Sequence, residues 1–333
     1  MSRDNPLHQI EAPTGEIIGI PVTVADDDRY FTLDELPAAR AYYDEHGYCV
    51  IRGVIPEAMT TAARQAWDAE MKPYTGYVYR QATGKPEFNT INDRGFIMNP
   101  VLNLQDLETK YFSRLKKAAL EVYASAPLMT AVRALIDAEP KLVQSMYFEG
   151  NSATWAHQDT YYLDSENIGG MVASWIALED IKPGAGRFYI YPGSHRIDIE
   201  KNGGDFDIAF HHDRYKQLII DIIAKYKLEC RAPALNRGDV VLWNARTIHG
   251  SLMTNQPDFS RSSLTAHFIP AKDRFLQFQS RIKTTAIDDY KGLIVQKPKN
   301  QDLARNRAIL AIETTFPKSY KFVRDRAIKM LTR

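Results

Sequence analysis

Thr154–Asp159 reads Thr-Trp-Ala-His-Gln-Asp, and it places a histidine and an aspartate two residues apart. On an extended strand, residues i and i+2 point to the same face, so His157 and Asp159 would converge on one point. An imidazole and a carboxylate make up two of the three ligands in a two-histidine, one-carboxylate facial triad. Such a triad holds non-haem Fe(II) and leaves coordination positions open for substrates. We expect the third ligand to be His249, within Trp243–Ser251.

The chain carries a second copy of the same spacing at His211-His212-Asp213. A histidine near an aspartate is more often a hydrogen-bonded pair than a metal site, so context must separate the two copies. The second copy lies in a polar run, 205–216, that leads into a helix-like segment. The first lies between strand-like runs, where a rigid and dry support for metal ligands is expected.

Composition excludes several classes of protein. The 333 residues are 44% hydrophobic and 25% charged with a formal net charge of +1, which favours a globular protein without a nucleic-acid partner. Two cysteines, Cys49 and Cys230, form neither a disulfide framework nor a zinc motif, which favours a cytoplasmic location. No apolar run approaches the roughly 20 residues of a membrane span, and the N-terminus lacks the pattern of a signal peptide.

Charge is concentrated at one end of the chain. Residues 271–333 hold 15 Lys and Arg against 6 Asp and Glu, whereas the remaining chain holds 27 against 35. This distribution is typical of a solvated helical tail. It is also compatible with a basic flank that attracts an anionic small molecule or a carrier.

Periodicity divides the chain into three parts. Up to about residue 140 it predicts helices, including one from Leu33 to about His46 that begins at a Thr32–Glu35 capping box and ends at Gly47. Short strands bounded by Gly and Pro then predict a β-sandwich or barrel. Their expected positions are Leu142–Phe148, Met171–Leu178, Arg187–Tyr191, Val240–Trp243 and Arg261–Ile269. From about residue 271 onward we expect basic helices, and with no repeat or linker we expect residues 1–333 to form one domain.

The segment 72–105 is rich in Gly, Pro and aromatic residues, among them Tyr74, Tyr77, Tyr79 and Phe88. Loops of this composition often line substrate pockets, although surface positions are the commoner fate of single aromatic residues.

Several segments in order resemble the phytanoyl-CoA dioxygenase family of Fe(II)/2-oxoglutarate oxygenases, from about Tyr48 to about Pro270. They are Gln144–Phe148, His157–Asp159, Trp175–Asp180, Tyr191–Arg196, Arg237–Val240, His249–Ser251 and Arg261. The segment Pro192-Gly193-Ser194-His195-Arg196 and an Arg about a dozen residues after the distal His are family hallmarks. One departure is Ala185-Gly186, where the family usually has Asn-Gly.

The resemblance implies a double-stranded β-helix, or jelly-roll, of the cupin type at about 141–270, wrapped by N- and C-terminal helices. It implies that His157, Asp159 and His249 bind Fe(II) and that Arg261 holds the far carboxylate of the cosubstrate 2-oxoglutarate. Met146 and Trp175 occupy positions that line the 2-oxoglutarate site in the family. Gln144 and Ser263 are further candidates, and Ser263 shares the strand face of Arg261, Thr265 and His267.

The implied activity is a dioxygenase that uses O₂ and 2-oxoglutarate to hydroxylate an unactivated C–H bond of a small molecule, with release of succinate and CO₂. The presence of Asp159 favours hydroxylation, because related halogenases lack this carboxylate. Two alternatives remain open from the sequence: a cupin-like metalloenzyme without redox chemistry, and a jelly roll that binds a ligand without catalysis.

Overall fold

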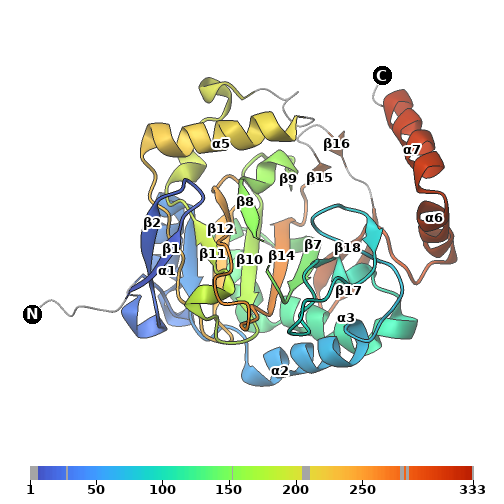
Figure 1. The fold of residues 1–333 in the computed structure, drawn as a ribbon, viewed down its shortest axis with the longest axis horizontal. Coiled ribbons are helices and arrows are strands. Elements are labelled where there is room, and N and C mark those ends of the chain that lie inside the picture. Colours follow the sequence, from blue (N-terminus) through green and yellow to red (C-terminus); the bar gives the residue numbers. More distant parts are fainter. Residues whose placement is uncertain are drawn as a thin grey trace, which may run out of the picture.

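Two facing β-sheets form the centre of the computed structural model, which describes residues 7–27, 29–151, 153–204, 211–277, 281–282 and 285–331 (Figure 1). The major sheet has eight strands in the order β17-β18-β7-β14-β10-β12-β3, with β6 paired to β7. Its members are β3 (Tyr48–Ile51), β6 (Val101–Leu102), β7 (Pro140–Phe148), β10 (Val172–Ala177), β12 (Val240–Asn244), β14 (Ser263–Pro270), β17 (Ala286–Tyr290) and β18 (Leu293–Lys297).

The minor sheet has the order β11-β13-β8 and is formed by β8 (Thr154–His157), β11 (Phe188–Ile190) and β13 (His249–Ser251). Three small sheets accompany it. They comprise β1 (Leu7–Glu11) with β2 (Ile17–Pro21), β4 (Val78–Tyr79) with β5 (Pro86–Glu87), and β9 (Leu163–Ser165) with β15 (Phe275–Gln277) and β16 (Arg281–Ile282). The fold is therefore mainly β and of the jelly-roll type, as the sequence predicted.

The seven α-helices that the structure describes are α1 (Leu36–His46), α2 (Glu57–Ala66), α3 (Thr109–Tyr123), α4 (Ala126–Ile136), α5 (His212–Tyr226), α6 (Ala304–Thr315) and α7 (Pro317–Leu331). Residues of α1 to α4 pack on one face of the major sheet, and α5 covers the outer face of the minor sheet (Figure 1). The expected capping box is present, because Thr32 and Glu35 are hydrogen-bonded through both backbone and side chain before α1 begins.

Alternation along the central strands separates the two faces of the major sheet. In β14, Leu264, Ala266 and Phe268 belong to the apolar core under the helices. The intervening residues Thr265 and His267 point to the opposite face, toward the minor sheet. All eight residues of β14 are buried, so both faces of the strand are covered. One face contacts the apolar core, and the other contacts polar and aromatic side chains between the sheets.

The expectation of a wholly helical part after residue 271 is wrong. Strands β15 to β18 occupy the chain between Phe275 and Lys297, and helix α6 begins only at Ala304. Strand β18 pairs in parallel with β7, and its Leu293 and Val295 are buried in the core under the helices. The excess of Lys and Arg in this part of the sequence concealed the short apolar runs Phe275-Leu276 of β15 and Leu293–Val295 of β18.

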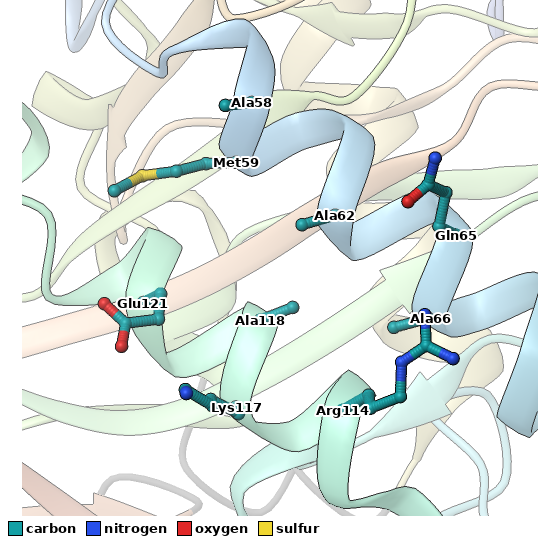
Figure 2. Close-up of a pocket in the computed structure, with 9 residues that line it drawn as sticks. All are labelled: Ala58, Met59, Ala62, Gln65, Ala66, Arg114, Lys117, Ala118 and Glu121. Atoms are coloured by element: carbon teal, nitrogen blue, oxygen red, sulfur yellow. The ribbon is translucent and has the colours of Figure 1, made fainter.

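A hollow of about 450 Å³ lies between α2 and α3, lined by Ala58, Ala62 and Ala66 of one helix and Ala118 of the other (Figure 2). Arg114, Lys117 and Glu121 surround it.

Among the described helices, none alone is long and apolar enough to cross a membrane. Only α3 and α4 together, bent at 50°, would pass by length and composition.

Gly47 ends α1 in the left-handed conformation that the sequence predicted, with φ of 80°. A Cβ at this position would lie 2.5 Å from Thr247 Oγ1 and would also clash with His195 Nδ1. Both neighbours lie where the chain that leads into β13 is held in place. Thr247 Oγ1 donates a hydrogen bond to Gly47 O. Ile248 N–H donates to Oγ of Ser194, the residue before His195. Gly47 therefore allows the end of α1 to approach the segment that leads into His249.

We predict that Gly47→Ala lowers the free energy of unfolding by about 3 kcal/mol, since the left-handed conformation costs a residue with a Cβ about 1–2 kcal/mol and the clash adds to it. Gly15→Ala is the matched control, because Gly15 has φ of 86° but nothing within 4 Å of the added Cβ. Urea denaturation of both variants measures the difference, and equal losses would contradict the proposed close approach.

Candidate active site

Three side chains from separate segments converge between the two sheets. His157 ends β8, Asp159 begins the following turn, and His249 begins β13, where it lies directly opposite His157. The distances from Asp159 Oδ1 to the Nε2 atoms of His157 and His249 are 3.7 and 3.6 Å. One potential ligand atom from each residue lies within 4.8 Å of the others. Asp159 is in a turn rather than on the strand, yet it converges with His157 as the spacing predicted.

Backbone carbonyls orient both imidazoles. The Nδ1 of His157 lies 2.9 Å from Trp155 O, and the Nδ1 of His249 lies 2.9 Å from Thr247 O. A carbonyl can only accept, so each Nδ1 carries a proton, and in the neutral form of each ring Nε2 is then the nitrogen whose lone pair is available to a metal. This arrangement fixes the tautomer that metal ligation requires.

The charge states suit a cation. Burial opposes the ionised form of Asp159, but His249, His267 and the hydrogen bond from His157 outweigh it and hold the pKa of Asp159 well below its ordinary value. Burial lowers the pKa of His249 to about 4. Near neutral pH the cluster therefore offers a carboxylate and a neutral imidazole. With the imidazole of His157, this donor set of two nitrogens and one oxygen fits Fe(II).

Arg261 lies next to β14, is 3% exposed, and has no carboxylate partner among the residues that the structure describes. Its Nε has no hydrogen-bond acceptor among them, and its guanidinium lies 5.1 Å from the centre of the Phe148 ring. Burial lowers the pKa of Arg261 to about 9, which still leaves it charged at neutral pH. A buried cation without a partner is costly, and a carboxylate from a bound molecule would offset that cost.

The three triad residues and Arg261 line the same cavity, which has a volume of about 60 Å³. Met146 and Trp175, which the family resemblance places at the 2-oxoglutarate site, also line it. They lie opposite Thr265 on β7 and β10, the two strands that flank β14. Gln144 and Ser263 are not among the described residues that line this cavity. Ser263 is nevertheless fully buried, and its hydroxyl has no hydrogen-bond partner among the described residues.

Several lining residues had no firm role in the sequence analysis. They are Gln81, Phe148, Thr154, Phe188, Trp243, Gly250, Ser251, Thr265 and His267. The two-residue period of β14 was a usable signal for Thr265 and His267, because it put them on the face of Arg261. Of the aromatic loop, only Gln81 reaches the cavity, whereas Tyr77 and Phe88 contact each other with centroids 4.0 Å apart.

The second copy of the histidine–aspartate spacing is not part of a metal cluster among the described residues. His211, His212 and Asp213 are exposed at the start of α5. The His212 ring instead contacts the rings of Tyr161 and Tyr162 at 5.9 Å. The grouping of three possible ligand atoms is thus found at the first copy and, within the described part of the chain, not at the second.

Comparison with known proteins agrees with this geometry. The family model for phytanoyl-CoA dioxygenase (PhyH) matches residues 43–263. The human peroxisomal phytanoyl-CoA dioxygenase is 24% identical over 263 residues, which cover 75% of this chain and 72% of that protein.

Solved structures share the fold at lower identity. The non-haem α-ketoglutarate-dependent carbocyclase SnoK from nogalamycin biosynthesis has a TM-score of 0.54 and 19% identity, covering 74% of this chain and 88% of SnoK. EctD from S. alaskensis, solved with 2-oxoglutarate and 5-hydroxyectoine, has a TM-score of 0.51 and 16% identity, covering 88% of this chain and 95% of EctD. The family match spans most of this chain and includes the triad and Arg261, so the protein belongs to the phytanoyl-CoA dioxygenase family of Fe(II)/2-oxoglutarate-dependent dioxygenases.

Proposed function

We propose that His157, Asp159 and His249 hold Fe(II), that Arg261 holds the far carboxylate of 2-oxoglutarate, and that the protein hydroxylates a C–H bond of a small-molecule substrate. The observation that carries this proposal is the buried guanidinium of Arg261, which has no carboxylate partner among the described residues and lines the same cavity as the triad. Bound Fe(II) would supply the redox chemistry that couples conversion of 2-oxoglutarate and O₂ into succinate and CO₂ to oxidation of the substrate.

The side chains of the cavity would bind and orient the cosubstrate. Arg261 offers a planar fork that matches a carboxylate through two parallel hydrogen bonds, which a lysine could not reproduce. Met146 and Trp175 flank Thr265 across three neighbouring strands, and their apolar surfaces would exclude water from the chain of the keto acid. Ser263, with its buried hydroxyl, stays a candidate for a polar contact near Arg261.

We propose that the substrate is anionic or carrier-bound and approaches from a neighbouring hollow. The cavity of about 60 Å³ leaves little room for a second molecule, whereas a hollow of about 520 Å³ shares Thr154 and Ser251 with it. The lining of this hollow is mainly apolar and includes one acid, Glu11, and one cation, Lys216, whose ammonium lies 5.2 Å from the centre of the Trp155 ring. The positive charge of residues 271–333 would attract the same class of molecule.

We propose a cytoplasmic location for the protein, because both cysteines are free thiols.

We predict that His157→Ala, Asp159→Ala and His249→Ala each lower succinate formation from 2-oxoglutarate by at least about a hundredfold, because each removes a donor atom that the metal needs. The measurement is succinate release with Fe(II), O₂ and 2-oxoglutarate. His211→Ala is the matched control and should keep wild-type turnover, because His211 is exposed and is not among the described residues that line the cavity.

Wild-type turnover by Asp159→Ala would refute the ligand assignment. The same protein loaded with Zn(II) should form no succinate, because Zn(II) has no redox chemistry. Conversion of a substrate by the Zn(II)-loaded protein would instead favour the cupin-like metalloenzyme without redox chemistry.

We predict that Arg261→Ala raises the KM for 2-oxoglutarate by roughly 10- to 100-fold, the equivalent of about 1.5–3 kcal/mol for hydrogen bonds to a charged group. Arg261→Lys should recover only part of the loss, because it keeps the charge without the fork. Initial rates at saturating Fe(II) give the KM.

Arg114→Ala serves as the control for loss of a positive charge, because Arg114 is exposed beside the hollow between α2 and α3. It should leave the KM for 2-oxoglutarate unchanged. An Arg261→Ala protein with the KM of the wild type would place the cosubstrate elsewhere.

A further inference from the structure

The two oxygens of Asp159 have different surroundings. Oδ1 lies 3.6–3.7 Å from the Nε2 atoms of both triad histidines. Oδ2 accepts a hydrogen bond of 2.8 Å from the indole N–H of Trp243 and lies 3.4 Å from Nε2 of a third histidine, His267. The carboxylate thus presents one oxygen to the triad and the other to the major sheet.

The contacts to Oδ2 come from strands that are separate from those of the triad histidines. Trp243 lies on β12 and His267 on β14, and these strands flank β10 in the major sheet. His157 and His249 lie on β8 and β13 of the minor sheet. Asp159 is therefore the point at which the histidine pair of one sheet is joined to two side chains of the other.

The chemistry of the contact assigns a tautomer to His267. Ionised Asp159 can only accept hydrogen bonds, so a favourable contact requires a proton on Nε2 of His267. His267 is 2% exposed, and its Nδ1 has no hydrogen-bond partner among the described residues. The His267 ring also meets the Trp243 ring edge-on, with centroids 6.1 Å apart. Its contact with Oδ2 is therefore the polar interaction, among the described residues, that can orient the imidazole.

We propose that His267 is a positioning residue, which acts with Trp243 to hold Oδ2 of Asp159 so that Oδ1 alone faces the metal position. This role rests on the proposed function of the triad and adds to it a residue that does not itself ligate the metal. Without the second contact, the carboxylate could rotate and offer both oxygens or neither. A carboxylate held by one oxygen leaves more coordination positions open to the cosubstrates.

Two variants of similar shape separate hydrogen bonding from packing. His267→Gln keeps an N–H donor near the position of Nε2, whereas His267→Met has the same chain length without a donor. The metal-free proteins are titrated with Co(II) in the absence of 2-oxoglutarate, and affinity and the visible absorption spectrum are recorded. Urea denaturation of the metal-free variants confirms that they fold.

We predict that His267→Met weakens Co(II) binding by about tenfold and changes the spectrum, as expected when an outer partner of a ligand is lost. His267→Gln should recover most of the affinity and the wild-type spectrum. His211→Met is the matched control for metal binding and should keep the wild-type affinity, because it removes an exposed imidazole that is not part of the ligand cluster among the described residues.

Wild-type affinity and spectrum in His267→Met would overturn the positioning role, and so would equal losses in the Met and Gln variants. If neither variant folds, neutron crystallography of the wild-type protein locates the proton of His267: a proton on Nε2 supports the role and a bare Nε2 overturns it. Failure of the wild-type protein to bind Co(II) or Fe(II) would refute the proposed metal site itself, a result distinct from any difference between the variants.

Discussion

The antiparallel pairing of β8 with β13 is the constraint on which the site depends. It sets His157 opposite His249 and points both rings into the space between the sheets. Because side chains alternate along a strand, a slip of one residue in this pairing would turn one imidazole to the outer face. The close approach of Gly47 to Thr247 and the hydrogen bond of Ile248 to Ser194 hold the segment before His249, so the helical N-terminal part contributes directly to the position of a ligand.

The second constraint is a row of buried polar groups for which the described residues provide no hydrogen-bond partner. Arg261, Ser263, Thr265 and His267 recur at every second position at the end of and along β14, and each has a buried polar atom without a hydrogen bond among the described residues. Buried polar groups in folded proteins are normally satisfied, so such a row indicates a place prepared for a bound molecule. The opposite face of the same strand is wholly apolar and packs under the helices, which provides the rigid support for this row.

Local spacing or one backbone preference was sufficient for the pair His157 and Asp159, for the five principal strands of 142–269 and for the left-handed residue after α1. The assignment of His249 as third ligand depended on the family resemblance. The sequence was insufficient where tertiary contacts decide. The strands between Phe275 and Lys297 are short and surrounded by basic residues, and β18 becomes a strand through its pairing with β7. Gln144 shares a strand with Met146 but does not line the cavity, and the contacts of Trp243 and His267 with Asp159 join residues that are 84 and 108 positions apart. No periodicity within one segment reports such contacts.

A crystal grown anaerobically with Fe(II) and 2-oxoglutarate, with diffraction data collected on either side of the iron absorption edge, tests the central claim most directly. The account predicts one iron peak bonded to Nε2 of His157, Oδ1 of Asp159 and Nε2 of His249, and a 2-oxoglutarate carboxylate paired with the guanidinium of Arg261. Iron bound elsewhere, for example at His211 and Asp213, or a keto acid distant from Arg261, would contradict it.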